Sequence, residues 1–210
     1  MVLAVQLGVL IPRPETELLI DFASAAVQRL PELGARPWVD LGTGSGALAL
    51  GAARSVAPRG HVWAVDLSDT AVRVARHNAA RLGLGHRVSV LQGSWADPLP
   101  EELRGSCGGV LSNPPYIAHE TLSELQAEVT RHEPWLALDG GAGEALGCLQ
   151  AVTRAAASLL APGGFLAVEM GGRSQAERLV QDMERQGFFV DIEIRSDYAG
   201  IARFVVAHRA

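Results

Sequence analysis

A glycine-rich turn between two apolar stretches is the feature that most constrains how this chain can fold. The run at residues 38–41 is typical of a buried strand, and the stretch that begins at Ala47 is typical of a helix. The turn between them consists of Gly42, Thr43, Gly44, Ser45 and Gly46. This order places the turn at the carboxyl end of a parallel strand, where open α/β sheets bind ligands. Glycines let the backbone approach a ligand closely, and the helix N-terminus offers N–H groups to an anion.

The rest of the sequence repeats this alternation of strands and helices. Further strands are predicted at residues 61–66, 87–91, 109–112, 164–170, 188–194 and 202–207. Helices are predicted at residues 70–81, where Ser68 can cap the first turn, and at residues 149–160. The order predicts an α/β fold with a doubly wound, mostly parallel seven-stranded sheet. A short turn near Tyr198 joins the last two strands and predicts an antiparallel C-terminal strand.

Length and composition limit what such a fold can do. The chain has 210 residues, 48% of them hydrophobic, which suffices for one domain with a sizeable core. Its formal net charge of -5 argues against tight, non-specific binding to nucleic acid, which depends on Lys and Arg. The cysteines, Cys107 and Cys148, are too few for a disulfide framework or a zinc site, so no metal is expected. The sequence shows neither an apolar run of membrane-spanning length nor a signal peptide.

Two further residues are candidates for binding a nucleotide-like ligand. Asp66 ends the second predicted strand, where an acidic side chain accepts ribose hydroxyls in dinucleotide folds, and its alternative role is helix capping. Trp95 follows the third strand and can stack on a flat base, although a buried structural tryptophan has the same signature. The turn also satisfies G-x-G-x-x-A through Gly42, Gly44 and Ala47, so the pattern alone leaves a dinucleotide site open.

The tetrapeptide Asn113-Pro114-Pro115-Tyr116 follows the fourth predicted strand. Its prolines lack a backbone N–H and fix φ, so the backbone is stiff and its carbonyls are free to accept hydrogen bonds. With the Asn113 side-chain carbonyl, two acceptors can hold both N–H bonds of a planar –NH₂ group and aim its nitrogen at an electrophile. Tyr116 can stack on that flat group. The alternative is an ordinary turn at the end of a strand.

Several segments, in this order, are similar to those of a known family. They are Leu10-Ile11-Pro12-Arg13-Pro14-Glu15-Thr16-Glu17, Asp40-Leu41-Gly42-Thr43-Gly44-Ser45-Gly46, Asn113-Pro114-Pro115-Tyr116-Ile117 and Arg131-His132-Glu133-Pro134. The chain resembles the HemK-type release factor glutamine methyltransferases over nearly its whole length. The first segment is the most specific, because glycine turns and Asn-Pro-Pro-Tyr occur across many amino-methyltransferases.

The resemblance implies a Rossmann-like class I methyltransferase fold with S-adenosyl-L-methionine as the methyl donor. It implies that the acceptor is the glutamine of a Gly-Gly-Gln loop in a peptide chain release factor. Asn113, Pro114 and Tyr116 are the expected catalytic residues, and Pro115 joins them in binding the substrate. The expected cofactor-binding residues are Gly42, Thr43, Gly44, Ser45, Gly46, Asp66, Trp95 and Asn113.

Three residues receive less definite roles. Arg13 and Glu15 are expected to contribute to the wall of the cofactor or substrate site, with a local ion pair as the alternative. Glu169 ends the fifth predicted strand and faces the ligand crevice, where it either contacts the ligand or supports another residue by hydrogen bonding.

The resemblance also sets expectations for domains and partners. Residues 1–30 are expected to form a Pro-Arg-Pro segment with a leading helix, and residues 31–210 the methyltransferase domain. Family members usually carry a small helical domain before this segment, and the sequence starts just upstream of it. We therefore expect that domain to be lacking and release-factor docking to be altered. A monomer is expected, in a bacterial cytoplasm or in a plastid or mitochondrion, with no membrane or nucleic-acid partner.

Two other functions remain open. An exocyclic amine of a DNA or RNA base presents the same pair of N–H bonds to Asn-Pro-Pro-Tyr, so base methylation is the nearest rival. Low net basicity and the lack of room for a base-recognition domain argue against it. The chain could instead be a cofactor-binding module without activity, which cofactor binding without turnover would reveal.

Overall fold

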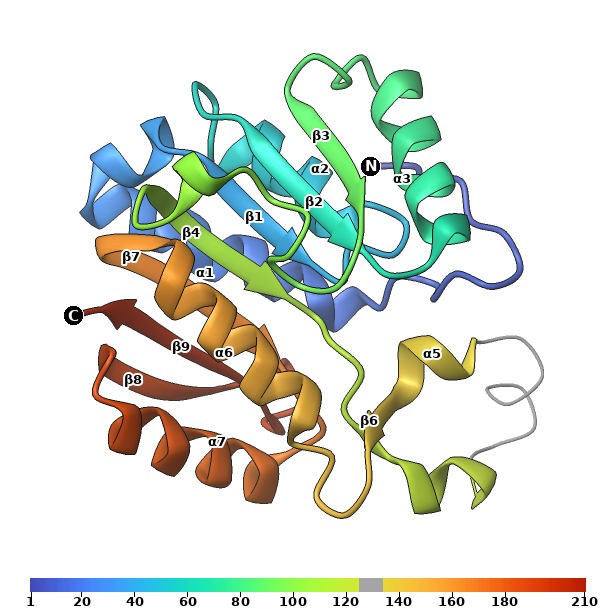
Figure 1. Ribbon diagram of the computed structural model, residues 1–210, viewed down its shortest axis with the longest axis vertical. Helices are drawn as coiled ribbons and strands as arrows, with labels where there is room; N and C mark the ends of the chain where they lie inside the picture. Colours follow the sequence, from blue (N-terminus) through green and yellow to red (C-terminus); the bar gives the residue numbers. More distant parts are fainter. Residues whose placement is uncertain (125–133) are drawn as a thin grey trace.

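Seven strands form the central sheet of the computed structural model, which describes residues 1–124 and 134–210 (Figure 1). The strands are β1 (Trp38–Leu41), β2 (Val62–Asp66), β3 (Val88–Gln92), β4 (Cys107–Ser112), β7 (Leu160–Glu169), β8 (Phe189–Ser196) and β9 (Ala202–Arg209). Their order across the sheet is β3-β2-β1-β4-β7-β9-β8. The first five are parallel, and β9 runs antiparallel between β7 and β8. The predicted mostly parallel sheet with an antiparallel C-terminal strand is confirmed.

The parallel register aligns the ends of three central strands at one edge of the sheet. Leu41 at the end of β1 pairs with Val65 of β2 and with Ser112 of β4. The residues that follow along these strands are Gly42, Asp66 and Asn113. The register therefore brings three motifs that are far apart in sequence to the carboxyl edge of the sheet, as expected for a ligand site in this fold.

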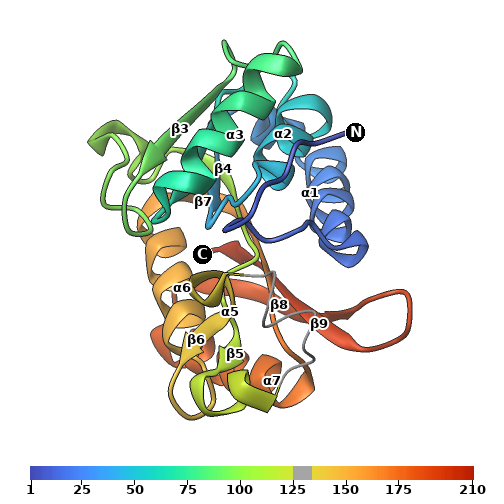
Figure 2. The same cartoon turned by 90° about the vertical axis from the view of Figure 1, so that its right-hand side faces the viewer.

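Helices cover both faces of the sheet (Figure 2). One face carries α1 (Leu18–Arg29), α2 (Ala47–Ser55) and α3 (Asp69–Arg81). The opposite face carries α6 (Gly147–Leu159) and α7 (Arg173–Gln186). The sequence prediction missed α7, although its buried residues Ala176, Leu179 and Met183 recur at helical spacing.

A small lobe extends beyond the carboxyl edge and was also missed by the sequence prediction. It contains a two-stranded parallel sheet, β5 (Ile117–Ala118) and β6 (Asp139–Gly141), and the short helix α5 (Trp135–Leu138) (Figure 2). These elements are too short to produce a recognisable periodic pattern. The described residues also form short 3₁₀ helices at η1 (Pro14–Glu17), η2 (Pro31–Ala35), η3 (Glu101–Leu103) and η4 (His119–Glu124).

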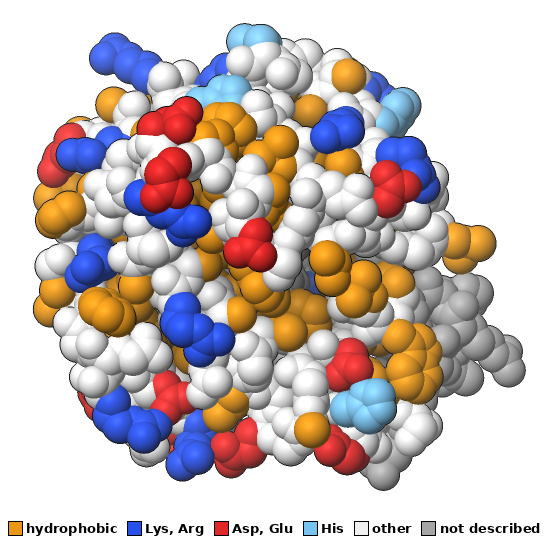
Figure 3. Space-filling view, in the orientation of Figure 1, with side chains coloured by type: hydrophobic (Ala, Val, Ile, Leu, Met, Phe, Trp, Pro, Cys, Tyr) orange, Lys and Arg blue, Asp and Glu red, His pale blue; other side chains and the backbone are white. Residues whose placement is uncertain are grey.

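Acidic and basic side chains are interspersed on the face shown in Figure 3, which has no continuous basic stripe. This mixture accords with the net charge of -5. In the part of the chain that the structure describes, no helix is both long enough and apolar enough to span a membrane.

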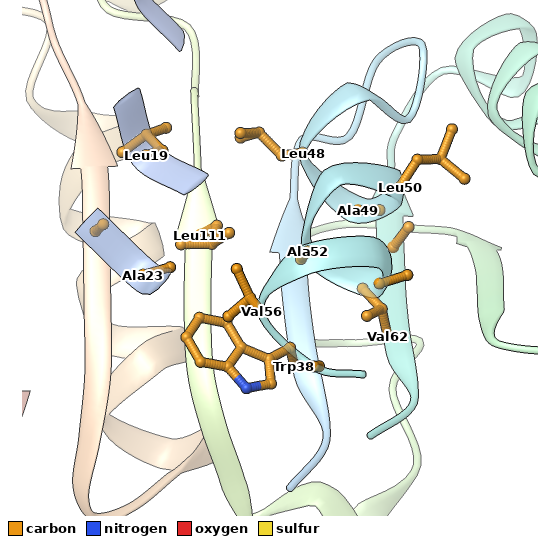
Figure 4. Packing of buried hydrophobic residues seen from close by; sticks show 14 of the residues in the cluster. Leu19, Ala23, Trp38, Leu48, Ala49, Leu50, Ala52, Val56, Val62 and Leu111 are labelled. Atoms are coloured by element: carbon orange, nitrogen blue, oxygen red, sulfur yellow. The ribbon is translucent and has the colours of Figure 1, made fainter. Parts of the chain in front are cut away.

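The core beneath α1 and α2 is organised around Trp38 (Figure 4). The indole is fully buried near Val56 and Leu111, and its N–H donates to the Leu33 carbonyl at 2.8 Å. Gly109 on the neighbouring strand β4 leaves room for the ring, because a Cβ there would lie 2.2 Å from it. The tryptophan and the glycine therefore lock β1 to β4, which fixes the positions of the turn and the tetrapeptide at their ends.

Candidate functional site

A cavity of about 310 Å³ lies at the carboxyl edge of β1, β2 and β4, within the size range of small-molecule sites. The N-terminal segment forms part of its wall through Gly8, Val9 and Leu10. Asn78 of α3 holds this segment in place. Its side chain exchanges two hydrogen bonds with the backbone of Ala4, at 2.8 and 2.9 Å, and also donates to a carbonyl of the glycine turn.

The glycine turn is bound to the sheet by its own backbone. The N–H groups of Gly42 and Thr43 both donate to the Val65 carbonyl at 2.9 Å. Gly44 has φ +55 and open space where a Cβ would project, so its backbone is accessible from the cavity that it lines. Gly46 has φ +87 and packs against α3, where a Cβ would lie 3.3 Å from that of Ala75.

Asp40 supports the turn from below. One carboxylate oxygen accepts hydrogen bonds from the Thr43 hydroxyl at 2.6 Å and from the N–H of Ala49 in the first turn of α2 at 2.9 Å. Asp40 thus supplies the side-chain acceptor that the Gly46 N-cap of α2 lacks. Its other oxygen, Oδ1, is buried without a hydrogen-bond partner among the described residues. Burial raises the pKa of Asp40 to about 7.

Asp66 faces the cavity from the end of β2. Its two oxygens accept separate backbone hydrogen bonds, from the N–H of Gly44 at 2.8 Å and from the N–H of Ser68 at 2.9 Å. Burial raises the pKa of this carboxyl, while the backbone hydrogen bonds oppose the shift. The helix cap is Ser68, whose hydroxyl accepts from the N–H of Ala71 at 3.3 Å. Each Asp66 oxygen retains a second acceptor site, so a pair of ribose hydroxyls matches its capacity.

Trp95 also lines the cavity, and it does so in an unusual backbone conformation. Its φ of +45 lies in the left-handed region, which bulky residues rarely adopt. Such strain is concentrated at functional sites, where the surrounding structure enforces it. The indole is half-buried, packs partly on the core and lines the cavity, so its position suits both of the roles that the sequence left open.

The tetrapeptide after β4 is divided between two hollows. Asn113 and Pro115 line the cavity, whereas Tyr116 lines an adjacent groove beside the start of α7. The Asn113 amide nitrogen donates to the Thr16 hydroxyl at 3.1 Å. The Tyr116 hydroxyl donates to Glu169 at 3.4 Å. Burial, followed by the charge of Glu169, raises the pKa of Tyr116 to about 12.

The structure brings together most of the predicted site residues. Those that line the cavity are Gly42, Thr43, Gly44, Ser45, Asp66, Trp95, Asn113 and Pro115. Gly46, Pro114 and Tyr116 lie next to it without lining it. Arg131, His132 and Glu133 of the fourth family segment lie outside the described residues. Their neighbour Pro134 does line the cavity.

Sequence reasoning missed several residues of the cavity wall. They are Gly8, Val9, Leu10, Pro12, Thr16, Leu67, Ser68, Ser94, Leu136, Ala137, Asp139 and Cys148, together with apolar residues of α2, β2 and α3. Leu10, Pro12 and Thr16 belong to the Pro-Arg-Pro segment, so their motif was the available signal. Asp139 and Cys148 belong to the small lobe and α6, where nothing in the local sequence marks them.

The residues present fit a nucleoside cofactor that also carries an amino-acid group. A carboxylate with free acceptor capacity suits a ribose, an indole suits a base, and exposed turn backbone suits close approach to the rest of the molecule. Across residues 1–124 and 134–210, no group of three or more His, Cys, Asp or Glu side chains is placed to hold a metal ion.

Comparison with known proteins identifies the family of this chain. The profile of a methyltransferase domain matches residues 35–194. A release factor glutamine methyltransferase of Synechocystis is 46% identical over 95% of this chain and 66% of its own length. The protein of the same name from Gloeobacter violaceus is 44% identical, over 98% of this chain and 69% of its own length. The chain thus spans about two thirds of the length of these relatives.

Solved structures show the same fold at low sequence identity. The N-terminal domain of human METTL16 in complex with SAH superimposes with a TM-score of 0.69 at 15% identity, covering 98% of this chain and 75% of that one. An rRNA-methylase structure from Clostridium thermocellum, described as putative in its own name, superimposes with a TM-score of 0.64 at 16% identity. The match covers 96% of this chain and 100% of that one. The fold is that of the class I methyltransferases, which use S-adenosyl-L-methionine. With its relatives at 44% and 46% identity, the chain belongs to the release factor glutamine methyltransferase family.

Proposed function

We propose that this chain transfers a methyl group from S-adenosyl-L-methionine to the side-chain amide nitrogen of the glutamine in a release factor Gly-Gly-Gln motif. The observation that supports this most directly is the position of Asn113. It lines the same cavity as the glycine turn and Asp66, and its amide N–H is already used by Thr16. With its NH₂ group turned toward Thr16, the planar amide leaves its carbonyl oxygen to face an acceptor amide.

The cofactor supplies a methyl group bound to a positively charged sulfur. The protein's task is to prepare the acceptor, because an amide nitrogen is a poor nucleophile whose lone pair is delocalised into its carbonyl. In the proposed geometry, the Asn113 oxygen and the Pro114 carbonyl accept the two N–H bonds of the glutamine amide. Two fixed acceptors hold the nitrogen in line with the methyl group and favour its pyramidal form.

The remaining tetrapeptide residues restrict the movement of the acceptor. Pro114 and Pro115 have fixed φ and no N–H, so the carbonyl acceptor cannot easily turn away. Tyr116 packs against the glutamine amide. With its pKa near 12, the phenol keeps its proton at neutral pH and does not serve as a base.

On the donor side, Asp66 accepts the ribose hydroxyls and Trp95 packs against the adenine. Gly42, Thr43, Gly44 and Ser45 surround the amino-acid part of the cofactor, and Gly46 supports them by packing against α3. This role of the glycine turn is consistent with its position at the carboxyl end of β1, where open α/β sheets bind ligands.

We also propose the domain boundaries, the protein partner, the oligomeric state and the location of the protein. Residues 1–30 provide the Pro-Arg-Pro wall and a leading helix, and residues 31–210 provide the methyltransferase domain. A release factor is the protein partner. The protein acts as a monomer in a bacterial cytoplasm or an organelle, where its partner works. Light scattering during gel filtration measures the oligomeric state.

Methyl incorporation from labelled S-adenosyl-L-methionine tests the proposed activity. The acceptors are a release factor, the same factor with Gln→Ala in its Gly-Gly-Gln loop, and a set of DNA and RNA oligonucleotides. Label on the wild-type factor alone is the expected result. Label on nucleic acid only would replace the proposal with base methylation, and cofactor binding without label on any acceptor would indicate an inactive module.

A further inference from the structure

A chain of hydrogen bonds reaches the Asn113 amide from two distant parts of the sequence. Asn113 Nδ2 donates to Thr16 Oγ1 at 3.1 Å, and Thr16 Oγ1 donates to Glu169 Oε2 at 2.7 Å. Thr16 belongs to η1 in the Pro-Arg-Pro segment, whereas Glu169 is the last residue of β7. The Tyr116 hydroxyl donates to the other oxygen of the same carboxylate at 3.4 Å. The proposed mechanism gives Glu169 no role and names Thr16 only as the hydrogen-bond partner of Asn113.

The direction of this chain is fixed by what each group can donate. An ionised carboxylate only accepts, so the single hydroxyl proton of Thr16 points at Glu169. The Thr16 oxygen then has only lone pairs left for Asn113, which must present its NH₂ group. A flipped amide would place two acceptors 3.1 Å apart and lose the hydrogen bond. The planar amide consequently directs its oxygen away from Thr16.

We propose that Thr16 and Glu169 are positioning residues that set which end of the Asn113 amide faces the acceptor. The inference rests on the proposed function, in which that oxygen accepts an N–H bond of the substrate. Thr16 and Glu169 have relative exposures of 6% and 2%, so water does not compete for their hydrogen bond. A buried carboxylate is costly to maintain, and here its two side-chain donors both belong to motifs of the site.

The arrangement predicts a pH dependence of the methyl-transfer step. Burial raises the pKa of Glu169, while Thr16, Tyr116 and Arg203 of β9 lower it and Glu15 of η1 raises it. Protonated Glu169 can donate to Thr16, which frees the Thr16 hydroxyl to donate to the Asn113 oxygen and stabilises the wrong amide orientation. The turnover rate should therefore fall in acid with a midpoint above the ordinary glutamate value of 4.5.

Replacement of Thr16 tests the chain with little change in shape. Thr16→Val keeps the volume and removes the hydroxyl, and Thr16→Ser keeps the hydroxyl. Thr153→Val removes a buried hydroxyl in α6 that does not line the cavity. We expect kcat at saturating cofactor to fall at least about tenfold in Thr16→Val and to stay within about twofold in the other two. Cofactor affinity should stay within about twofold in all three. Glu169→Gln should abolish the acid limb of the kcat profile.

Nuclear magnetic resonance of the side-chain amides provides a readout that does not depend on turnover. In the wild type, the Asn113 NH₂ group should show a hydrogen-bonded, exchange-protected proton that Thr16→Val removes and Thr16→Ser retains. The Asn78 amide, bound to Ala4 and Ser45, serves as the internal control. An unchanged Asn113 signal together with unchanged kcat in Thr16→Val would overturn the inference. Failure of wild-type methylation would instead overturn the proposed function, and the amide signals would still test the positioning.

Discussion

The two walls of the cavity are held in place by different kinds of contact. On the side proposed to bind the methyl donor, Asp66 accepts hydrogen bonds from Gly44 and Ser68, and the turn backbone donates to the neighbouring strand. On the side proposed to bind the acceptor, Asn113 is hydrogen-bonded to Thr16, which is 97 residues away in the sequence, and Thr16 is hydrogen-bonded to Glu169, 153 residues from Thr16. The donor wall is therefore mainly a backbone structure set by sheet register. The acceptor wall depends on a few side-chain hydrogen bonds that exist only once the whole domain has folded.

Asn113→Ala should have the largest effect on activity and should separate the two walls. It removes the hydrogen-bond acceptor that we propose for the reacting amide, and the loss of one such preorganised group lowers kcat by about 10²- to 10³-fold. Cofactor affinity should change little, because the backbone of the donor wall remains. Single-turnover methylation and cofactor titration measure the two effects. Unchanged methylation with intact cofactor binding would exclude the proposed role of Asn113.

Asp66→Ala should produce the opposite pattern. Hydrogen bonds to a charged group contribute about 1.5–3 kcal/mol, so cofactor affinity should fall by about 10- to 100-fold. At saturating cofactor, kcat should recover most of its wild-type value. Asp69→Ala is the matched control, since this exposed aspartate forms an ion pair with Arg73 on the surface of α3 and does not line the cavity. A variant that loses kcat but not affinity would show that the two walls are not independent.

The same difference explains what could be predicted from the sequence. The glycine turn, Asp66 and the strands around them are marked by local patterns, and the structure places them as expected. The Asn113–Thr16–Glu169 chain has no local signature, because its members are joined by the crossing of η1 over the ends of β4 and β7. The sequence indicated that Glu169 faces the crevice but could not identify its partners. The small lobe was missed because its elements are too short for periodicity.

Asp40→Asn should show that Asp40, which supports the glycine turn of the donor wall, makes the free energy of unfolding depend on pH. Folded Asp40 keeps its proton up to about pH 7, whereas in the unfolded chain it loses the proton near pH 3.8. Between these values the folded state binds more protons, so the free energy of unfolding should fall as pH rises, by roughly 1 kcal/mol per pH unit. Urea unfolding at pH 5 and pH 7 measures the slope. Asp40→Asn should reduce it, and an identical slope in the variant would exclude Asp40 as its source.

A matched pair of glycine substitutions can separate binding from folding within the donor wall. Gly44→Ala and Gly46→Ala both place a side chain at positive φ, at a cost of about 1–2 kcal/mol each. A methyl group at Gly44 meets open space on the cavity side, so this variant should lose cofactor affinity in addition. A methyl group at Gly46 lies 3.3 Å from Leu50 and Ala75, so this variant should lose more stability. Thermal unfolding with and without cofactor distinguishes the two variants. Equal losses of stability and of cofactor affinity in both would contradict the separate roles of Gly44 in binding and Gly46 in folding.

Tyr116→Phe should have the smallest effect on kcat. It compares the contribution of the Tyr116 hydroxyl with that of Thr16 in the acceptor wall. The variant keeps the ring, which is proposed to pack on the substrate amide, and removes a hydroxyl 3.4 Å from Glu169, a distance at which a hydrogen bond is weak. With the Thr16 bond to Glu169 intact at 2.7 Å, kcat should fall by only about two- to threefold. Losing one of its donors should also raise the pKa of Glu169 and move the acid limb of the kcat profile to higher pH. A loss of kcat as large as that of Thr16→Val would mean that Tyr116, rather than Thr16, holds the Glu169 carboxylate in place. The acceptor wall would then be organised by the tetrapeptide and β7, without the N-terminal segment.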